Sequence, residues 1–235
     1  NIQTTGENSI ILKSRDLTET ERTKLFADLT IGGKNEVIED SFTSIGPSLG
    51  AEMTRKAISA FIIVSLCIIL FIAYAFRKVA KPVSSWKYGI VAVLTLIHDV
   101  LLVTGVFVIL GHFAGVELDA LFVVGLLTVL GLSINDTIVV FDRIREHGRE
   151  ITPTTIFDVV NTSLNTTLSR TIITSLTILF VVVVLFLFGG GTLHDFAFAL
   201  IIGTIVGTYS SFSVATPVYI GLYRHWPRIR QLWSK

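Results

Sequence analysis

Residues 57–76 read AISAFIIVSLCIILFIAYAF, a stretch that contains no charged side chain. About 20 predominantly apolar residues in an α-helix cross the hydrocarbon core of a bilayer. Lipid offers no hydrogen-bonding partner to free backbone groups, so a segment of this kind is stable there only as a helix. The stretch therefore predicts a transmembrane helix, and with it an integral membrane protein rather than a soluble domain.

The rest of the chain has the same character. Four more apolar stretches of sufficient length lie at residues 88–112, 118–141, 171–188 and 196–222. Hydrophobic residues make up 51% of the 235 residues and charged residues only 16%, below the quarter or so that is usual in soluble domains. The net charge of +1 gives no overall basic signal for nucleic acid. We expect an α-helical membrane protein with five visible transmembrane helices over residues 57–222.

Lysine and arginine residues gather in alternate connections between these stretches. The segments 77–87, 142–169 and the tail 223–235 carry them, whereas the segments 113–117 and 189–195 carry none. Basic loops stay on the cytoplasmic side of a membrane. Residues 223–235 are therefore predicted to be a basic cytoplasmic tail, and residues 1–56 are predicted to lie outside the cytoplasm.

Residues 1–56 have the pattern of a small α/β region. A strand is predicted at 9–12, and Thr18 with Glu21 forms a capping-box pattern that opens a helix to about residue 29. A second strand is predicted at 36–45, after a Gly-Gly turn. Two strands and one helix are too little to fold alone, so we expect this region to be the end of a larger extracytoplasmic head whose beginning precedes residue 1.

Ionisable residues at membrane depth are costly and mark functional sites by default. Asp99, beside His98, lies near the middle of the second predicted span. Asp136, beside Asn135, lies in the cytoplasmic half of the third, and Arg170 opens the fourth. These residues are the candidates for a proton pathway.

The spacing of polar residues on the fourth span suggests a partner for Asp136. Arg170, Thr174 and Thr177 recur at intervals of four and three residues, which puts them on one helical face. A carboxyl group in an apolar seam can hold a proton, and an arginine nearby favours its release. An arginine that approaches and retreats would let Asp136 take up and release protons, and this pairing with Arg170 is our hypothesis.

The last span combines small and hydroxyl residues. Thr204, Thr208 and Ser211 share one face, and Gly203 with Gly207 forms a small-xxx-small pair that permits close approach of a neighbouring helix. Together with the fourth span, these residues predict a polar seam between helices.

Plainer interpretations stand beside these hypotheses. Asp136 can form a hydrogen bond with the backbone of a neighbouring helix, and His98 can be the hydrogen-bonding partner of Asp99. Arg170 can serve only as one of the basic residues that mark the cytoplasmic side. His98 has no partner at metal-ligand spacing, so no metal site is expected. A nucleophile and base in a plausible arrangement are also missing from the sequence, which argues against an enzyme and against an organic cofactor.

Several motifs resemble one known family in both order and spacing. Residues 131–146 read GLSINDTIVVFDRIRE, which resembles the hallmark of SecF, the smaller subunit of the SecD–SecF complex of bacterial protein export. Residues 98–100 (HDV), 167–171 (TLSRT) and 203–211 (GTIVGTYSS) resemble its other motifs. The Asn-Asp-Thr triplet at 135–137 favours SecF over the paralogous SecD.

The resemblance implies a six-span subunit in the bacterial inner membrane, related to the resistance–nodulation–division transporters. It implies SecD, the Sec channel, a preprotein and membrane lipid as partners, with protons as the coupling ion. By motif, Asp136 would bind the proton, Arg170 would be its charged partner and Asp99 a supporting residue, while SecD would contribute a further aspartate. A fused SecD–SecF polypeptide, a small-molecule or lipid efflux transporter of the same superfamily and a non-transporting scaffold are the alternatives.

Overall fold

The structure, a computed structural model, describes residues 2–5, 9–12, 14, 17–30, 37–39, 47–77, 85–116, 118–147, 151, 152 and 154–233. The chain divides into two compact units, Asn1–Ser59 and Ala60–Lys235. Each unit is described by itself.

The first unit contains a β-hairpin and a short helix. Strand β1 (Ile2–Thr5) pairs antiparallel with β2 (Ser9–Leu12), and Ile2 lies opposite Leu12. The predicted strand at 9–12 is therefore confirmed. Of the strand predicted at 36–45, only residues 37–39 are among those described, and they are not in a strand.

Helix α1 (Glu19–Leu29) begins at the predicted capping box. The Thr18 hydroxyl accepts a hydrogen bond from the Glu21 amide, and the Thr18 amide donates to the Glu21 carboxylate at 3.0 Å. This reciprocal pair satisfies two amides that a helix start otherwise leaves without partners. Arg22 on the same helix contacts the Glu39 carboxylate at 2.7 Å, which ties α1 to the segment at 37–39.

The second unit is a helical bundle. The long helices are α2 (Pro47–Ala75, which begins in the first unit), α3 (Ser85–Ala114), α4 (Ala120–Glu146), α5 (Ile156–Phe188), α6 (Gly190–Ser213) and α7 (Ala215–Trp233). Five segments in the described part of the chain are long and apolar enough to cross a membrane, and they overlap the five predicted spans. The prediction of an α-helical membrane protein is confirmed.

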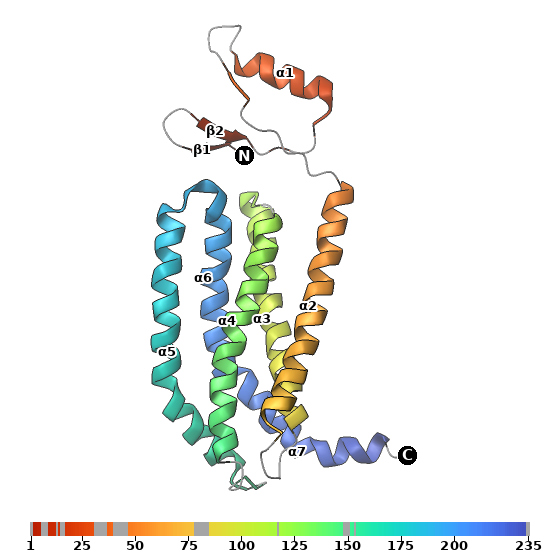
Figure 1. Cartoon of the computed structure of the whole chain (residues 1–235), viewed down its shortest axis with the longest axis vertical. Coiled ribbons are helices and arrows are strands. Elements are labelled where there is room, and N and C mark those ends of the chain that lie inside the picture. Colours follow the sequence, from red (N-terminus) through yellow and green to blue (C-terminus); the bar gives the residue numbers. More distant parts are fainter. Residues whose placement is uncertain are drawn as a thin grey trace. The chain divides into compact units, whose positions relative to one another are not determined.

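Two helix boundaries differ from the prediction. Helix α5 starts at Ile156, so the predicted span 171–188 is the second part of one long helix. The predicted span 196–222 is interrupted at Val214, between α6 and α7, and α7 turns away from the axis of α6 (Figure 1). Pro217 accounts for the break, because a proline has no amide proton to donate to the carbonyl four residues earlier.

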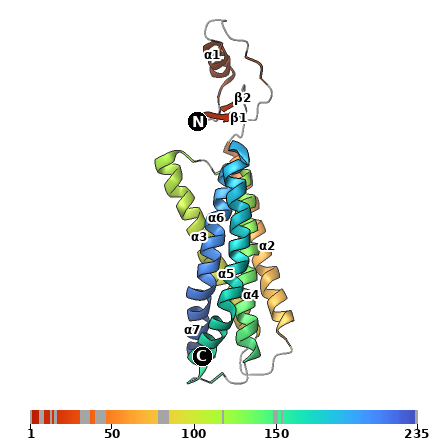
Figure 2. The same cartoon turned by 90° about the vertical axis from the view of Figure 1, so that its left-hand side faces the viewer.

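The apolar interior of the bundle has two parts, at opposite ends. One cluster includes Tyr88, Phe141, Ile156 and Tyr219, and it lies where α2 and α4 end and α3 and α5 begin (Figures 1 and 2). The other includes Phe107 and lies toward the α3–α4 connection and the α5–α6 turn.

A polar layer separates these two clusters. Along α4, Val129 belongs to one cluster and Val140 to the other, and the buried Ser133, Asp136 and Thr137 lie between them. Apolar packing above and below therefore surrounds the polar residues of this layer, so their hydrogen bonds are made to one another and to helix carbonyls.

Candidate functional site

The polar layer depends on a close approach of α4 and α6. A Cβ atom at Gly203 would lie 2.1 Å from Val129 Cγ2, and one at Gly207 would lie 2.9 Å from Ser133 Cβ. Both distances are too short for any side chain, so glycine is required for this contact at both positions. The small-xxx-small pair is where the structure brings α4 against α6, as its spacing suggests.

The first carboxyl group of the layer is Asp99 on α3, whose side chain is 0% exposed. Ser133 of α4 and Ser210 of α6 both donate to its Oδ2, at 2.5 and 2.9 Å. His98 Nδ1 lies 3.0 Å from the other oxygen, Oδ1. Asp99 therefore joins three helices, and the carboxyl group is held at both oxygens.

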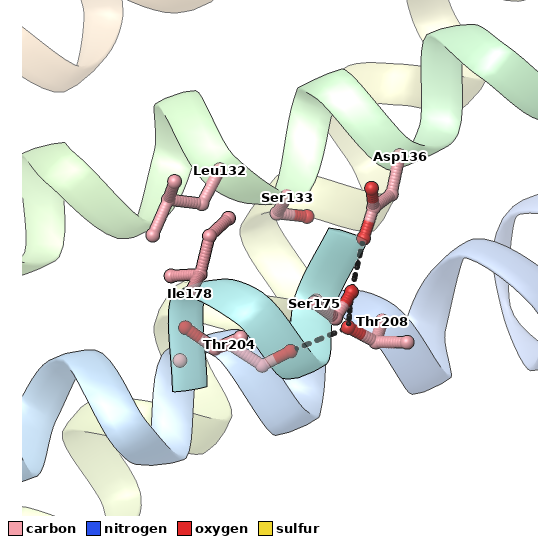
Figure 3. A pocket seen from close by; sticks show the side chains of 9 residues that line it. Leu132, Ser133, Asp136, Ser175, Ile178, Thr204 and Thr208 are labelled. Atoms are coloured by element: carbon pink, nitrogen blue, oxygen red, sulfur yellow. Dashed lines mark hydrogen bonds between the residues drawn. The ribbon is translucent and has the colours of Figure 1, made fainter. Parts of the chain in front are cut away.

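The second carboxyl group is Asp136 on α4, which is 7% exposed. Ser175 of α5 donates to its Oδ2 at 3.1 Å, and Thr208 of α6 donates to Ser175 Oγ at 2.7 Å (Figure 3). Asp136 thus begins a chain of hydroxyl groups that crosses from α4 through α5 to α6.

A small pocket opens beside Asp136. Its walls come from α4, α5 and α6, and they are formed by Leu132, Ser133, Asp136, Ser175, Ile178, Gly203, Thr204, Gly207 and Thr208 (Figure 3). The empty space is about enough for a single water molecule, and its polar walls offer such a molecule hydrogen-bonding partners. The pocket is a place where a proton could reach Asp136 through water.

A further hydroxyl contact joins α4 to α6 in the same layer. Thr137 Oγ1 and Ser211 Oγ are 3.0 Å apart, and both residues are buried. The polar face predicted for the last span is confirmed here, since Thr208 and Ser211 both point into the layer.

The structure does not bring Arg170 to Asp136. Arg170 is exposed on α5, and no ion pair joins it to any carboxylate among the described residues. Thr174 and Thr177 also lie away from the layer, and each bonds a carbonyl of its own helix. The face of α5 that is buried instead carries Thr167, Thr171 and Ser175.

Of the other two predicted residues, His98 and Asn135, one lies at the polar layer and the other does not. His98 lies against Asp99, as described, whereas Asn135 is exposed on α4 and points away from the polar layer. Three hydroxyl residues that contact the carboxyl groups are absent from our predicted set: Ser133, Ser175 and Ser210. A signal existed for Ser133, which precedes Asp136 by three residues and so shares its helical face.

The chemistry that this layer can support is exchange of protons at a carboxyl group. Hydroxyl groups donate to both carboxyl groups, and no cluster of three or more metal-ligating side chains occurs among the described residues. Asp136 accepts from the Ser175 hydroxyl group and borders the pocket, whereas Asp99 is bonded at both of its oxygens.

Taken together, these features define a multi-pass membrane protein whose helices enclose two buried carboxyl groups in a polar layer. The family model described as "Protein export membrane protein SecD/SecF, C-terminal" matches residues 27–225. The chain belongs to this family, and the resemblance predicted from its motifs is confirmed.

Individual relatives agree with this assignment. The protein translocase subunit SecF of Thermobaculum terrenum is 50% identical over 170 residues, which cover 72% of this chain and 53% of that protein. The protein of the same name from Anaerolinea thermophila is 36% identical over 230 residues, which cover 96% and 74%. The chain thus spans about half the length of the first relative and about three quarters of the second.

A solved structure has the same fold. It is described as the crystal structure of SecDF in a super-membrane-facing form, and it aligns with a TM-score of 0.68 and 31% identity. The alignment covers 93% of this chain and 28% of that one.

Proposed function

We propose that this chain acts as a SecF-type subunit of the protein-export machinery, which uses the proton gradient to move preproteins outward across the bacterial inner membrane. The names of its relatives as translocase subunits and its family support the export role. The partner we propose is SecD, because the SecDF chain that it resembles is much longer than the matched part. The Sec channel and a preprotein complete the assembly.

The observation that carries the proton-coupled part of the proposal is the environment of Asp136. It is a buried carboxyl group within apolar spans, it borders a pocket of water size, and its hydrogen-bond donor is a hydroxyl group rather than a cation. Among the described residues, no cation forms an ion pair with Asp136 that would hold it ionised. Asp136 is therefore the proton-binding residue in this proposal.

Arg170 is the proposed charged partner of Asp136, although Arg170 and Asp136 are apart in this conformation. It precedes Ser175 by five residues, which corresponds to about 7.5 Å along the axis of α5. A guanidinium group on the outside of a membrane bundle is costly without a partner. We propose that SecD covers this face of α5 and supplies a carboxylate to Arg170 while Arg170 is apart from Asp136.

The proposed orientation follows from the basic residues. The ends of α2 and α4 and the starts of α3 and α5 lie at one end of the bundle with α7 (Figure 1). The sequence segments 77–87 and 142–169 carry the lysines and arginines that favour the cytoplasm. Residues 1–56 would then be outside the cytoplasm, where they can meet an emerging preprotein.

The test is export in proton-energised membrane vesicles that contain SecD and the Asp136→Asn variant. We expect stimulation by the gradient to fall at least about tenfold, while the complex co-purifies intact. Thr128→Val is the matched control, because Thr128 is exposed on the same helix and its hydroxyl group, within the described part of the chain, bonds the Val124 carbonyl alone.

Two outcomes would be decisive. Loss of stimulation in Asp136→Asn, with the control unaffected, assigns the coupling role to Asp136. Full stimulation in Asp136→Asn would contradict proton coupling through this residue, and the chain would then be a scaffold for the translocase.

A further inference from the structure

The hydroxyl groups next to Asp136 each have more acceptors than protons. Ser175 Oγ lies 3.1 Å from Asp136 Oδ2 and 2.9 Å from the Thr171 carbonyl oxygen. Thr208 Oγ1 lies 2.7 Å from Ser175 Oγ and 2.8 Å from the Thr204 carbonyl oxygen. A hydroxyl group donates one hydrogen bond, so each of these two hydroxyl groups can donate to only one of its two acceptors at a time.

One choice suits an ionised Asp136. Ser175 then donates to the carboxylate, and Thr208 donates to Ser175, so that all the hydrogen bonds point toward the negative charge. Hydrogen bonds that follow one direction in this way strengthen one another. A hydrogen bond to an ionised acceptor is also stronger than one to a neutral group.

The other choice suits a protonated Asp136. The added proton on Oδ2 can be donated to Ser175 Oγ, whose own proton then turns to the Thr171 carbonyl. Thr208 is then free to donate to the Thr204 carbonyl. Each hydroxyl keeps one hydrogen bond in both arrangements, so neither arrangement leaves a buried donor without an acceptor.

We propose that Ser175 and Thr208 are positioning residues that transmit the protonation state of Asp136 from α4 to the backbones of α5 and α6. This inference rests on the proposed function of Asp136 and extends it, because it names the groups through which a bound proton acts on neighbouring helices. The two carbonyls that gain a hydrogen bond, at Thr171 and Thr204, each lie one turn before the hydroxyl residue on its own helix.

The surroundings permit such a rearrangement. Asp136, Ser175, Thr204 and Thr208 all border the small pocket, so the hydroxyl groups can rotate without displacing packed side chains (Figure 3). Rotation of a hydroxyl group changes no heavy-atom position, and the pocket has about the volume of the one water molecule that would deliver a proton.

The test separates hydroxyl chemistry from packing at one position. Thr208→Val keeps the volume and removes the hydroxyl group, whereas Thr208→Ser keeps the hydroxyl group and removes a methyl group. Gradient-stimulated export, measured with SecD present, should fall roughly threefold to tenfold in Thr208→Val and return in Thr208→Ser. Thr128→Val is again the control for loss of a hydroxyl group.

The opposite result, with normal gradient-stimulated export in Thr208→Val and reduced export in Thr208→Ser, would overturn the inference. That result would show that the volume of the Thr208 side chain matters and its hydroxyl group does not. Ser175→Ala is the second variant, and it should reproduce the loss seen in Thr208→Val. Its matched control is Ser213→Ala, since Ser213 is exposed and its hydroxyl group has the Tyr209 carbonyl as its one acceptor among the residues that the structure describes.

A spectroscopic measurement keeps this inference distinct from the proposed function. The infrared band of the Asp136 carboxyl group, isolated as the difference between the native complex and Asp136→Asn, should shift in Ser175→Ala and Thr208→Val and remain in place in the two controls. An unchanged band in both variants would overturn the relay, whatever the export results. If the band shifts but Asp136→Asn exports normally, the relay stands and the coupling role fails.

Discussion

The two buried carboxyl groups of this bundle lie in one polar layer and are held in different ways. Asp99 is 0% exposed, and its two oxygens contact Ser133, Ser210 and His98. Asp136 is 7% exposed and accepts from the Ser175 hydroxyl, which has a second acceptor on its own helix. Both groups are buried, so the difference between them lies chiefly in the other acceptors that are open to their donors.

The donors at Asp99 have fewer alternatives. Among the described residues, the Ser133 hydroxyl has no other acceptor within hydrogen-bonding distance, whereas Ser210 also reaches the Gly207 carbonyl at 3.1 Å. A change at Asp99 would therefore leave a buried hydroxyl without a partner, and a change at Asp136 would not. We interpret Asp99 as the group that holds α3, α4 and α6 together.

The largest expected effect comes from removing each carboxyl group in turn. Asp99→Leu should lower the free energy of unfolding by about 3 kcal/mol. It removes two strong interhelical hydrogen bonds and leaves the Ser133 hydroxyl group without an acceptor. Asp136→Leu should cost only about 1 kcal/mol, since Ser175 and Thr208 retain helix carbonyls as acceptors. Unfolding of the purified complex in mixed detergent micelles measures the free energy of unfolding of both variants. Equal losses of stability would contradict the proposed difference between Asp99 and Asp136.

The next effect concerns the helix contact on which both sites depend. Gly203→Ala should destabilise the bundle by about 2 kcal/mol, because the new methyl group would lie 2.1 Å from Val129. Gly131 on α4 is the control, since a Cβ there has open space around it. Gly131→Ala should leave the unfolding free energy unchanged or raise it by up to about 1 kcal/mol. Equal behaviour of the two variants would contradict the close α4–α6 packing.

A smaller effect separates two of the serine donors, Ser133 and Ser175. Ser133→Ala should cost about 1.5 kcal/mol and Ser175→Ala about 0.5 kcal/mol, the upper and average values for such bonds between membrane helices. The difference follows because, of these two serines, Ser133 donates to the carboxyl group of Asp99, which α6 also holds through Ser210. The same unfolding measurement in mixed detergent micelles compares the two variants. A larger loss of stability for Ser175→Ala than for Ser133→Ala would contradict the structural role of Asp99.

A further prediction concerns a hydroxyl pair outside both sites. Tyr88 and Tyr219 are buried, and their hydroxyl oxygens are 3.0 Å apart. Tyr219→Phe alone should cost about 1 kcal/mol, because it leaves the Tyr88 hydroxyl without this partner. Adding Tyr88→Phe should restore most of that loss, and a double variant that is less stable than either single variant would contradict this interpretation.

The sequence predicted the framework of the fold better than the details of the site. Long apolar runs set the five spans, and Thr18 with Glu21 set the start of α1, because both signals are local. The break at Val214 was missed because hydropathy continues through it, although Pro217 gave a local reason for it.

The face of α5 was harder to predict. Hydroxyl residues occur at 171, 174, 175 and 177, so a helical period fits more than one face. We expected Arg170, Thr174 and Thr177 on the polar side, whereas the structure buries Thr171 and Ser175. Only packing against α4 and α6 selects between these faces, and a single span carries no information about its neighbours. The pairing of Arg170 with Asp136 stays a prediction.

The most direct test of the difference between the two carboxyl groups separates the coupling role of each group from its role in stability. Gradient-stimulated export with SecD present and the free energy of unfolding would be measured for Asp136→Leu and for Asp99→Leu. Our account predicts that Asp136→Leu loses gradient stimulation with a small loss of stability, whereas Asp99→Leu loses mainly stability. Full gradient stimulation in Asp136→Leu would contradict the account.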